Sequence, residues 1–147
     1  MRPIKFRGKT EEGHWVYGDF SLINSYEKPL IFEGLFDEFL VIPETVGQYT
    51  GVNDSKRTAE YPDGQPIYEG DIIKADLPQK WHDGVRNLRL ACGRVYFEKG
   101  SFKVTDRAED VRLDDFVKDV VWEVLGNVWE DGELLSDCKK AIKTQVY

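Results

Sequence analysis

The stretch that decides the fold is ETVGQYTGVNDSKRTAEYPDGQPIYEGDII, residues 44–73. Gly47 and Gly51 stand on either side of Tyr49. This spacing suits a sharply bent strand, because glycine tolerates a bulge and the close approach of another backbone. The polar run that follows contains YPDG, with proline and glycine where a β-turn favours them. We therefore expect a bent strand and then a loop that returns the chain to the sheet.

The end of this stretch predicts a tight corner at Glu69, Gly70 and Asp71, after which IIK begins the next strand. Small barrels switch strand direction at corners of this kind. The residues that we expect to shape the backbone are Gly47, Tyr49, Gly51, Tyr68, Gly70, Asp71 and Gly126. The stretch thus specifies backbone geometry more clearly than it specifies a reaction.

Further strands are expected on the N-terminal side. In RPIKFRGK, apolar and basic residues alternate, so Ile4 and Phe6 share one face of a strand and the basic side chains share the other. HWVYGDFSLI follows a turn, and residues 2–23 therefore predict a hairpin. GLFDEFLVIP contains an apolar run that ends at Pro43, for which a short helical turn at residues 36–40 is the alternative.

On the C-terminal side, PQKWHDGVRN at residues 78–87 predicts a loop. LRLACGRVYFE and SFKVTD then predict two strands joined by a turn, and VVWEVLGNVWE predicts a third with a kink at Gly126. RAEDVRLDDFVKD is charged and suits a short helical turn. Apolar residues between Leu134 and Ile142 recur at three- and four-residue spacing, which predicts an amphipathic helix at residues 132–145.

These elements indicate a mainly β, or β-rich α+β, fold: a small antiparallel barrel with an N-terminal hairpin extension and a short C-terminal helix. The 147 residues match the size of one domain, which can bury roughly 70% of its unfolded surface. We expect a single compact domain, 1–147. The alternative is an N-terminal β subdomain at 1–43 and a barrel at 44–135, with the terminal helix at 132–145.

The composition, 41% hydrophobic and 32% charged, is typical of a soluble folded domain. No apolar run approaches the roughly 20 residues that cross a bilayer, and MRPIKFRGK lacks an apolar signal core. We therefore expect a cytoplasmic protein without a membrane partner. Cys92 and Cys138 lie far apart and lack the spacing of a metal or redox motif, so we expect free, partly buried thiols.

As a set, RPIKFRGK…HWVYGD, VGQYTG, GQPIYEGDIIK and EVLGNVWEDGELL resemble the YopX-like family of phage and prophage proteins, in the same order and with similar spacing from residue 2 to about 135. The resemblance implies a mainly β protein whose C-terminal portion is similar to an SH3-type barrel, made in a bacterial host. It implies no catalytic residue and no cofactor, because the family's function is unknown. The polar loop at 52–66 is longer than the family's usual connection.

Catalysis has weak support in the residues themselves. Asp54, Asp63, Glu69 and Asp71 are the carboxylates that a metal-assisted hydrolase would recruit. Glu69 and Asp71 form the best pair, since they flank one glycine and would share a strand face. Carboxylates beside glycine more often accept backbone hydrogen bonds in turns. His14 and His82 have no ligand partner at metal spacing, and no nucleophile elbow or phosphate loop occurs.

Binding is the function that these residues favour. The candidate surface combines a basic N-terminal strand with an aromatic loop residue: Arg2, Lys5, Arg7, Lys9 and Trp81. KKAIK near the C-terminus is a second basic candidate. Other aromatics that suit an interface are Trp15, Tyr17, Tyr49, Tyr61, Tyr68 and Trp129, most of which we expect to be buried.

Three functions follow, in order of preference. The first is a non-enzymatic protein-binding or assembly module that self-associates or binds a host partner. The second is a nucleic-acid-binding barrel that uses the RPIKFRGK face, which the formal charge of −7 disfavours. The third is a metal-assisted hydrolase centred on Glu69 and Asp71.

Overall fold

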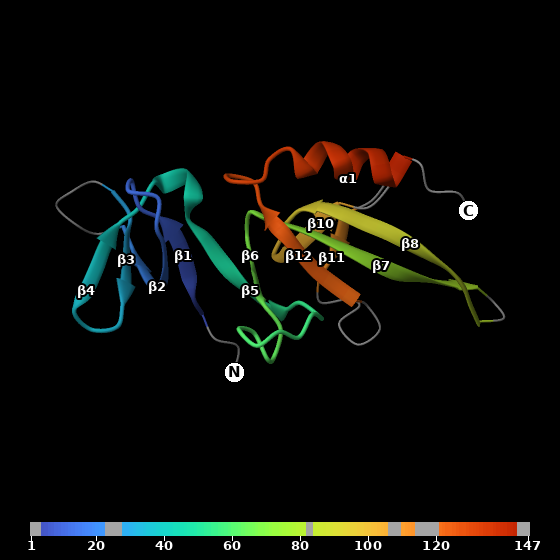
Figure 1. Cartoon of the computed structure of the whole chain (residues 1–147), viewed down its shortest axis with the longest axis horizontal. Coiled ribbons are helices and arrows are strands. Elements are labelled where there is room, and N and C mark those ends of the chain that lie inside the picture. The colour runs from blue at the N-terminus through green and yellow to red at the C-terminus, as the bar shows by residue number, and fades with distance from the viewer. Residues whose placement is uncertain (1–3, 23–27, 82–83, 106–109, 114–120, 144–147) are drawn as a thin grey trace. The chain divides into compact units, whose positions relative to one another are not determined.

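The structure is a computed structural model that describes residues 4–22, 28–81, 84–105, 110–113 and 121–143. Contacts divide the chain into two compact units, Met1–Gly51 and Val52–Tyr147 (Figure 1). The division considered from the sequence lay between residues 43 and 44. Each unit has its own core.

The first unit is an antiparallel sheet with the strand order β4-β3-β2-β1-β5. Its strands are β1 (Phe6–Lys9), β2 (Trp15–Ser21), β3 (Leu30–Glu33), β4 (Asp37–Leu40) and β5 (Gly47–Asn53). A 3-10 helix, η1 (Pro43–Thr45), links β4 to β5. Residues 37–40 therefore form a strand and not the alternative helical turn. Pro43 starts η1, where its missing N–H leaves no hydrogen bond unmade.

The core of the first unit lies on one face of this sheet. Val16, Ile31 and Val41 are buried there. The half-buried side chains that pack against them are Phe6, Phe20, Phe39 and Val46. Phe6 and Phe20 contact each other with ring centroids 5.2 Å apart. Because strand side chains alternate, the basic residues of β1 lie on the opposite face, as the sequence pattern predicts.

The second unit contains two three-stranded antiparallel sheets, in the orders β12-β7-β8 and β11-β10-β9. The strands are β6 (Pro66–Tyr68), β7 (Asp71–Trp81), β8 (Gly84–Arg94), β9 (Tyr96–Glu98), β10 (Ser101–Thr105), β11 (Asp110–Arg112) and β12 (Val121–Asn127). In the strand order, β6 is the hydrogen-bonded neighbour of β5. Between Val124 and Gly126 the register of β12 against β7 shifts by a β-bulge.

The larger core belongs to this second unit. It is built from buried side chains of nearly every strand: Ile67, Ile73, Ala75, Ala91, Val95, Phe102, Val104, Val111, Leu113 and Trp122. Trp122 and Ile73 sit on the neighbouring strands β12 and β7, and Phe102 comes from the other sheet. Both sheets therefore share one apolar interior.

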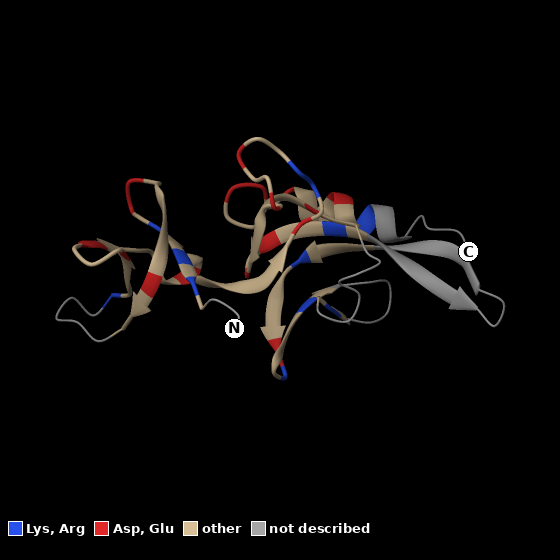
Figure 2. Cartoon of the chain, turned by 90° about the horizontal axis from the view of Figure 1, so that it is seen from below, with Lys and Arg blue, Asp and Glu red and all other residues tan. Residues whose placement is uncertain are grey.

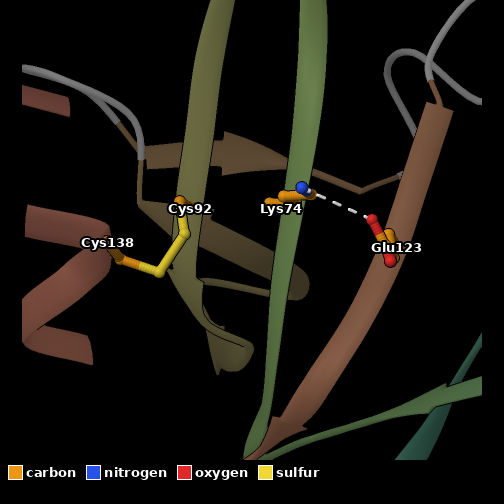
Figure 3. The surroundings of a disulfide bond; sticks show 4 residues. All are labelled: Lys74, Cys92, Glu123 and Cys138. Carbon is orange, nitrogen blue, oxygen red and sulfur yellow. Dashed lines mark ion pairs between the residues drawn. A yellow bond between two sulfur atoms is a disulfide. The ribbon is translucent and has the colours of Figure 1, made fainter. Parts of the chain in front are cut away.

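The helix α1 (Leu134–Lys143) covers a second apolar cluster of this unit (Figure 1). Leu134 and Leu135 of α1 pack against Ile72 of β7, and Cys138 lies beside Cys92 of β8. The two sulfurs form a disulfide with a Cα–Cα distance of 5.2 Å (Figure 3). The expectation of free thiols is wrong, because the fold brings together two residues that are 46 positions apart.

The region predicted as the loop 78–87 is also different. Within it β7 extends to Trp81 and β8 begins at Gly84, with Pro78 opposite Leu88 and Trp81 opposite Gly84. Pro78 is tolerated because the described pairing of β7 with β12 ends at Asp76, so the missing N–H falls beyond that ladder. Of the predicted helical turn at 107–119, residues 110–112 form β11, and the other positions lie largely outside the described residues.

The mainly β fold class with antiparallel sheets and one helix is confirmed. Within the described ranges, the backbone pairings define open sheets and do not close a barrel. None of the helices in the described part of the chain is long and apolar enough to cross a membrane.

Candidate binding face on the first sheet

Basic and aromatic side chains meet on the face of the first sheet that points away from its core. In the antiparallel pairing of β1 with β2, Arg7 lies opposite Tyr17 and Lys9 lies opposite Trp15. Lys5 precedes β1 and shares the face by alternation. We call Lys5, Arg7, Lys9, Trp15 and Tyr17 the cationic–aromatic face. Figure 2 shows the basic positions along this strand near the N-terminus.

The cations of this face lie over the aromatic rings. The Arg7 guanidinium carbon is 4.7 Å from the Trp15 ring centroid, and the Lys9 Nζ is 6.0 Å from the same ring. The Lys5 Nζ is 5.8 Å from the Tyr17 ring centroid. These distances fall within the cation–π range of about 6 Å. The rings therefore hold the positive charges in place on the sheet.

Exposure differs among these side chains in a way that suits binding. Arg7 is only 6% exposed, whereas Tyr17 is 38% exposed and Lys5 is also exposed. Lys9 and Trp15 are half-buried. A ligand would therefore meet two lysines and two ring edges at the surface. The buried Arg7 adds a fixed positive charge beneath them.

Tyr49 of β5 borders this face. Its backbone N–H donates to the Lys5 carbonyl oxygen at 2.7 Å, next to the pairing of Phe6 with Gln48. Burial raises the pKa of the Tyr49 hydroxyl above its ordinary value of 10.0, because desolvation penalises the phenolate. The hydroxyl is therefore protonated at neutral pH and adds no negative charge beside the lysines.

The remaining predicted surface residues are not all gathered here. Arg2 lies outside the described residues. Trp81 ends β7 in the second unit, and its side chain also lies outside the described part of the chain. The second basic candidate begins with Lys139 and Lys140, which are exposed on α1. These two helix lysines have no aromatic partner described beside them.

The Glu69–Asp71 corner has a structural role, because Asp71 hydrogen-bonds to the backbone of the turn. The carboxylate Oδ2 of Asp71, which is 2% exposed, accepts a hydrogen bond from the Tyr68 N–H at 2.8 Å. Gly70 between them has φ +85°. Among the described residues, no three His, Cys, Asp or Glu side chains gather as metal ligands would. His14 is exposed, and His82 lies outside the described residues.

Asp54 has a role that the sequence did not reveal. It is 3% exposed, and its Oδ1 accepts from the Gln65 N–H at 2.8 Å while its Oδ2 accepts from the Val124 N–H at 3.3 Å. Its neighbour Ser55 exchanges two further hydrogen bonds with the Trp122 backbone. This pair fastens the base of the polar loop to β12, so Asp54 is a structural anchor.

The other signature positions lie at bends of the strands. Gly47 starts β5 opposite Arg7, and Gly51 lies within β5 with φ +85°. Gly126 lies at the bulge of β12, where the Asp131 carboxylate occupies the space of a β-carbon. Among the described aromatics that the sequence singled out, Tyr68 is buried, Tyr17 is exposed, and the others are half-buried: Trp15, Tyr49, Tyr61 and Trp129.

Comparison with known proteins gives one finding. The family model described as YopX protein matches residues 5–136. No curated protein and no solved structure matches the chain. The matched span includes the cationic–aromatic face, the polar loop with its anchor and the Tyr68–Asp71 corner. The chain belongs to the YopX protein family.

Proposed function

We propose that this protein is a non-enzymatic binding and assembly module of a phage or prophage, acting in the cytoplasm of the bacterial host. Its cationic–aromatic face binds an acidic, partly apolar segment of a protein. The observation that carries the proposal is the placement of Lys5, Arg7 and Lys9 over the rings of Trp15 and Tyr17.

An acidic ligand matches the charge of this face. Cations held on rings are partly desolvated and lose little further conformational entropy on binding. A carboxylate therefore binds them with a more favourable free energy than it binds freely moving lysines. The chain as a whole carries a formal charge of −7. A cluster of positive charge on an acidic protein is therefore a local feature, which can select one acidic partner at short range.

A protein segment suits the face better than a nucleic acid does. Single-stranded nucleic acids bind by stacking bases on open aromatic faces, and here Arg7 covers Trp15 while Lys5 covers Tyr17. Leucine and phenylalanine side chains can instead contact the ring edges while neighbouring carboxylates reach the lysines.

The test is a fluorescence anisotropy titration of the whole chain with three labelled probes. One probe is an octapeptide of alternating Glu and Leu, the second has Lys in place of Glu, and the third is an oligo-dT strand. We expect only the acidic peptide to bind at low salt. Replacing both lysines (Lys5→Gln with Lys9→Gln) should weaken binding at least about tenfold, since rim charges steer and orient acidic partners.

The matched control removes the same two charges elsewhere, by Lys139→Gln with Lys140→Gln on the exposed side of α1. This variant should bind like the wild type. Equal weakening by both variants would mean that only net charge matters, and the proposal would fail. Tight, salt-dependent binding of oligo-dT that requires Lys5 and Lys9 would favour the nucleic-acid function instead.

A further inference from the structure

The β3–β4 hairpin presents an unusual surface at its tip. Leu35 is 89% exposed and Phe36 is 92% exposed, so both large apolar side chains point into solvent. Three exposed acids flank them: Glu33, Asp37 and Glu38. We call residues 33–38 the acidic hairpin. Its sequence, EGLFDE, has the acidic and partly apolar character that the cationic–aromatic face requires.

The acidic hairpin and the cationic–aromatic face belong to the same sheet. Following the register from strand to strand, Arg7 lies opposite Tyr17, Asp19 opposite Phe32, and Phe32 opposite Glu38. Glu33 also accepts a hydrogen bond from the Tyr17 N–H at 3.0 Å. One sheet face therefore runs from basic at β1, through the aromatic rings and Asp19 at β2, to the acidic Glu38 at β4.

A face with this order of charges is complementary to its own copy after a half-turn. Two acidic hairpins would repel each other if they met tip to tip, because like charges would be juxtaposed. A twofold rotation instead places β4 of one copy over β1 of the other, twice in the same interface. Leu35 and Phe36 then contact the Trp15 and Tyr17 rings while Glu38, which shares the face with Arg7 and Tyr17, approaches the lysines.

We propose that two copies of this chain form a twofold dimer in which the acidic hairpin of each docks on the cationic–aromatic face of the other. The inference rests on the proposed function and names the acidic segment that the face binds. Because both contacts are satisfied within the pair, the assembly closes at two copies and does not extend into filaments.

The test is light scattering coupled to size exclusion, over a hundredfold range of protein concentration at low and at moderate salt. We expect the mass to rise from one copy to two and no further, and the dimer to weaken with salt because its charges are exposed. Serine replacements at the tip (Leu35→Ser with Phe36→Ser) should weaken the dimer by removing its apolar contact. Circular dichroism checks that each variant is folded.

Charge reversal gives the sharper result. The variants Lys5→Glu with Lys9→Glu, and Asp37→Lys with Glu38→Lys, should each be monomeric alone. Mixed together, they should form a heterodimer, because both of its contacts are complementary. The acidic hairpin of the first variant meets the basic face of the second, and the basic hairpin of the second meets the acidic face of the first. The control Lys139→Glu with Lys140→Glu should dimerise as the wild type does.

A wild-type monomer at every concentration would overturn the dimer, as would a mixture that fails to associate or a mass that grows beyond two copies. None of these results by itself contradicts the proposed function, which the peptide titration tests separately. If the acidic octapeptide still binds the wild type and not Lys5→Gln with Lys9→Gln, the face binds an acidic partner other than a second copy.

Discussion

At the corner before β7, Gly70 packs closely against the ring of Trp129. Gly70 has φ +85°, its N–H donates to the Val95 carbonyl at 2.9 Å, and its carbonyl accepts from Val128 at 2.9 Å. A β-carbon at Gly70 would overlap the ring of Trp129. The contact joins the IYEGD and GNVWED motifs, which stand far apart in the sequence, so these two motifs meet in one packing interaction.

Gly70→Ala should lower the free energy of unfolding by at least about 2 kcal/mol, because the left-handed backbone disfavours a β-carbon and the Trp129 ring blocks it. Urea denaturation followed by tryptophan fluorescence measures the change. Gly100→Ala is the matched control, since Gly100 has φ +82° and open space around it. It should cost only about 1 kcal/mol. Equal losses for both variants would show that the tryptophan contact contributes nothing.

Asp54→Asn should destabilise the chain by about 2 kcal/mol. The carboxylate accepts two buried backbone hydrogen bonds, and an amide offers one oxygen while turning its own N–H groups toward a donor. Asp63→Asn, at an exposed position of the same loop, should leave the thermal midpoint unchanged. A loss of similar size at Asp63 would refute the anchoring role of Asp54.

Residue-level prediction succeeded where the cause is local. The Glu69–Asp71 corner follows from a glycine between two carboxylates, and the structure gives Asp71 a backbone hydrogen bond of the kind expected in turns. Asp54 could not be placed in this way, because its second partner, Val124, is 70 residues distant. Nothing in the sequence near Asp54 indicates that partner.

At the scale of elements, alternation identified strands but not their length. β1, β2 and β10 follow from side-chain periodicity, whereas the β7–β8 hairpin contains Pro78 and polar residues that are typical of a loop. The helix α1 was also predictable from its apolar spacing. The place where α1 attaches could not be predicted, because the disulfide forms only once the fold has brought the helix beside β8.

The disulfide between α1 and β8 should stabilise the oxidised protein by about 2 to 4 kcal/mol, since it closes a loop of 46 residues in the unfolded chain. Urea denaturation with and without reductant measures the difference. Cys92→Ala with Cys138→Ala should be insensitive to reductant. Alkylation of the folded, unreduced protein should add no label, and two labels per chain would contradict the bond.

In a reducing cytoplasm these cysteines would be held as thiols. The helix α1 would then depend on Leu134, Leu135 and Ile72 for its attachment. Figure 3 shows that the Lys74–Glu123 ion pair, 3.5 Å long, lies on the neighbouring strands β7 and β12 and not on the helix. Reduction should therefore loosen α1 while leaving this sheet paired.

At the scale of the whole molecule, the two units differ in how much they bury. The second unit has the larger core and the disulfide, whereas four apolar side chains are buried among the described residues of the first. A fragment of 52–147 should fold alone and give a dispersed amide NMR spectrum. The fragment 1–51 should not, because chains of this size are marginal without a metal, a disulfide or a partner. A folded, monomeric 1–51 would contradict this.

The candidate face could be predicted only in part. Alternation in RPIKFRGK places the basic residues together, because that depends on one strand. Their position over Trp15 and Tyr17 depends on the register of β1 against β2, which the turn at residues 10–14 sets. The exposure of Leu35 and Phe36 depends on the hairpin between β3 and β4. The apolar sequence around these residues does not indicate a hairpin tip.

β4 stands at one end of the first sheet's strand order, and such a strand can recruit strands from other chains into aggregates. The acids Asp37 and Glu38 occupy half of this short strand and are exposed. Carboxylates at an outer strand repel further strands of the same kind, so they protect a chain with solvent-facing Leu35 and Phe36 from fibril growth. Replacing them with neutral residues would lower the solubility of the protein while its fold is still intact.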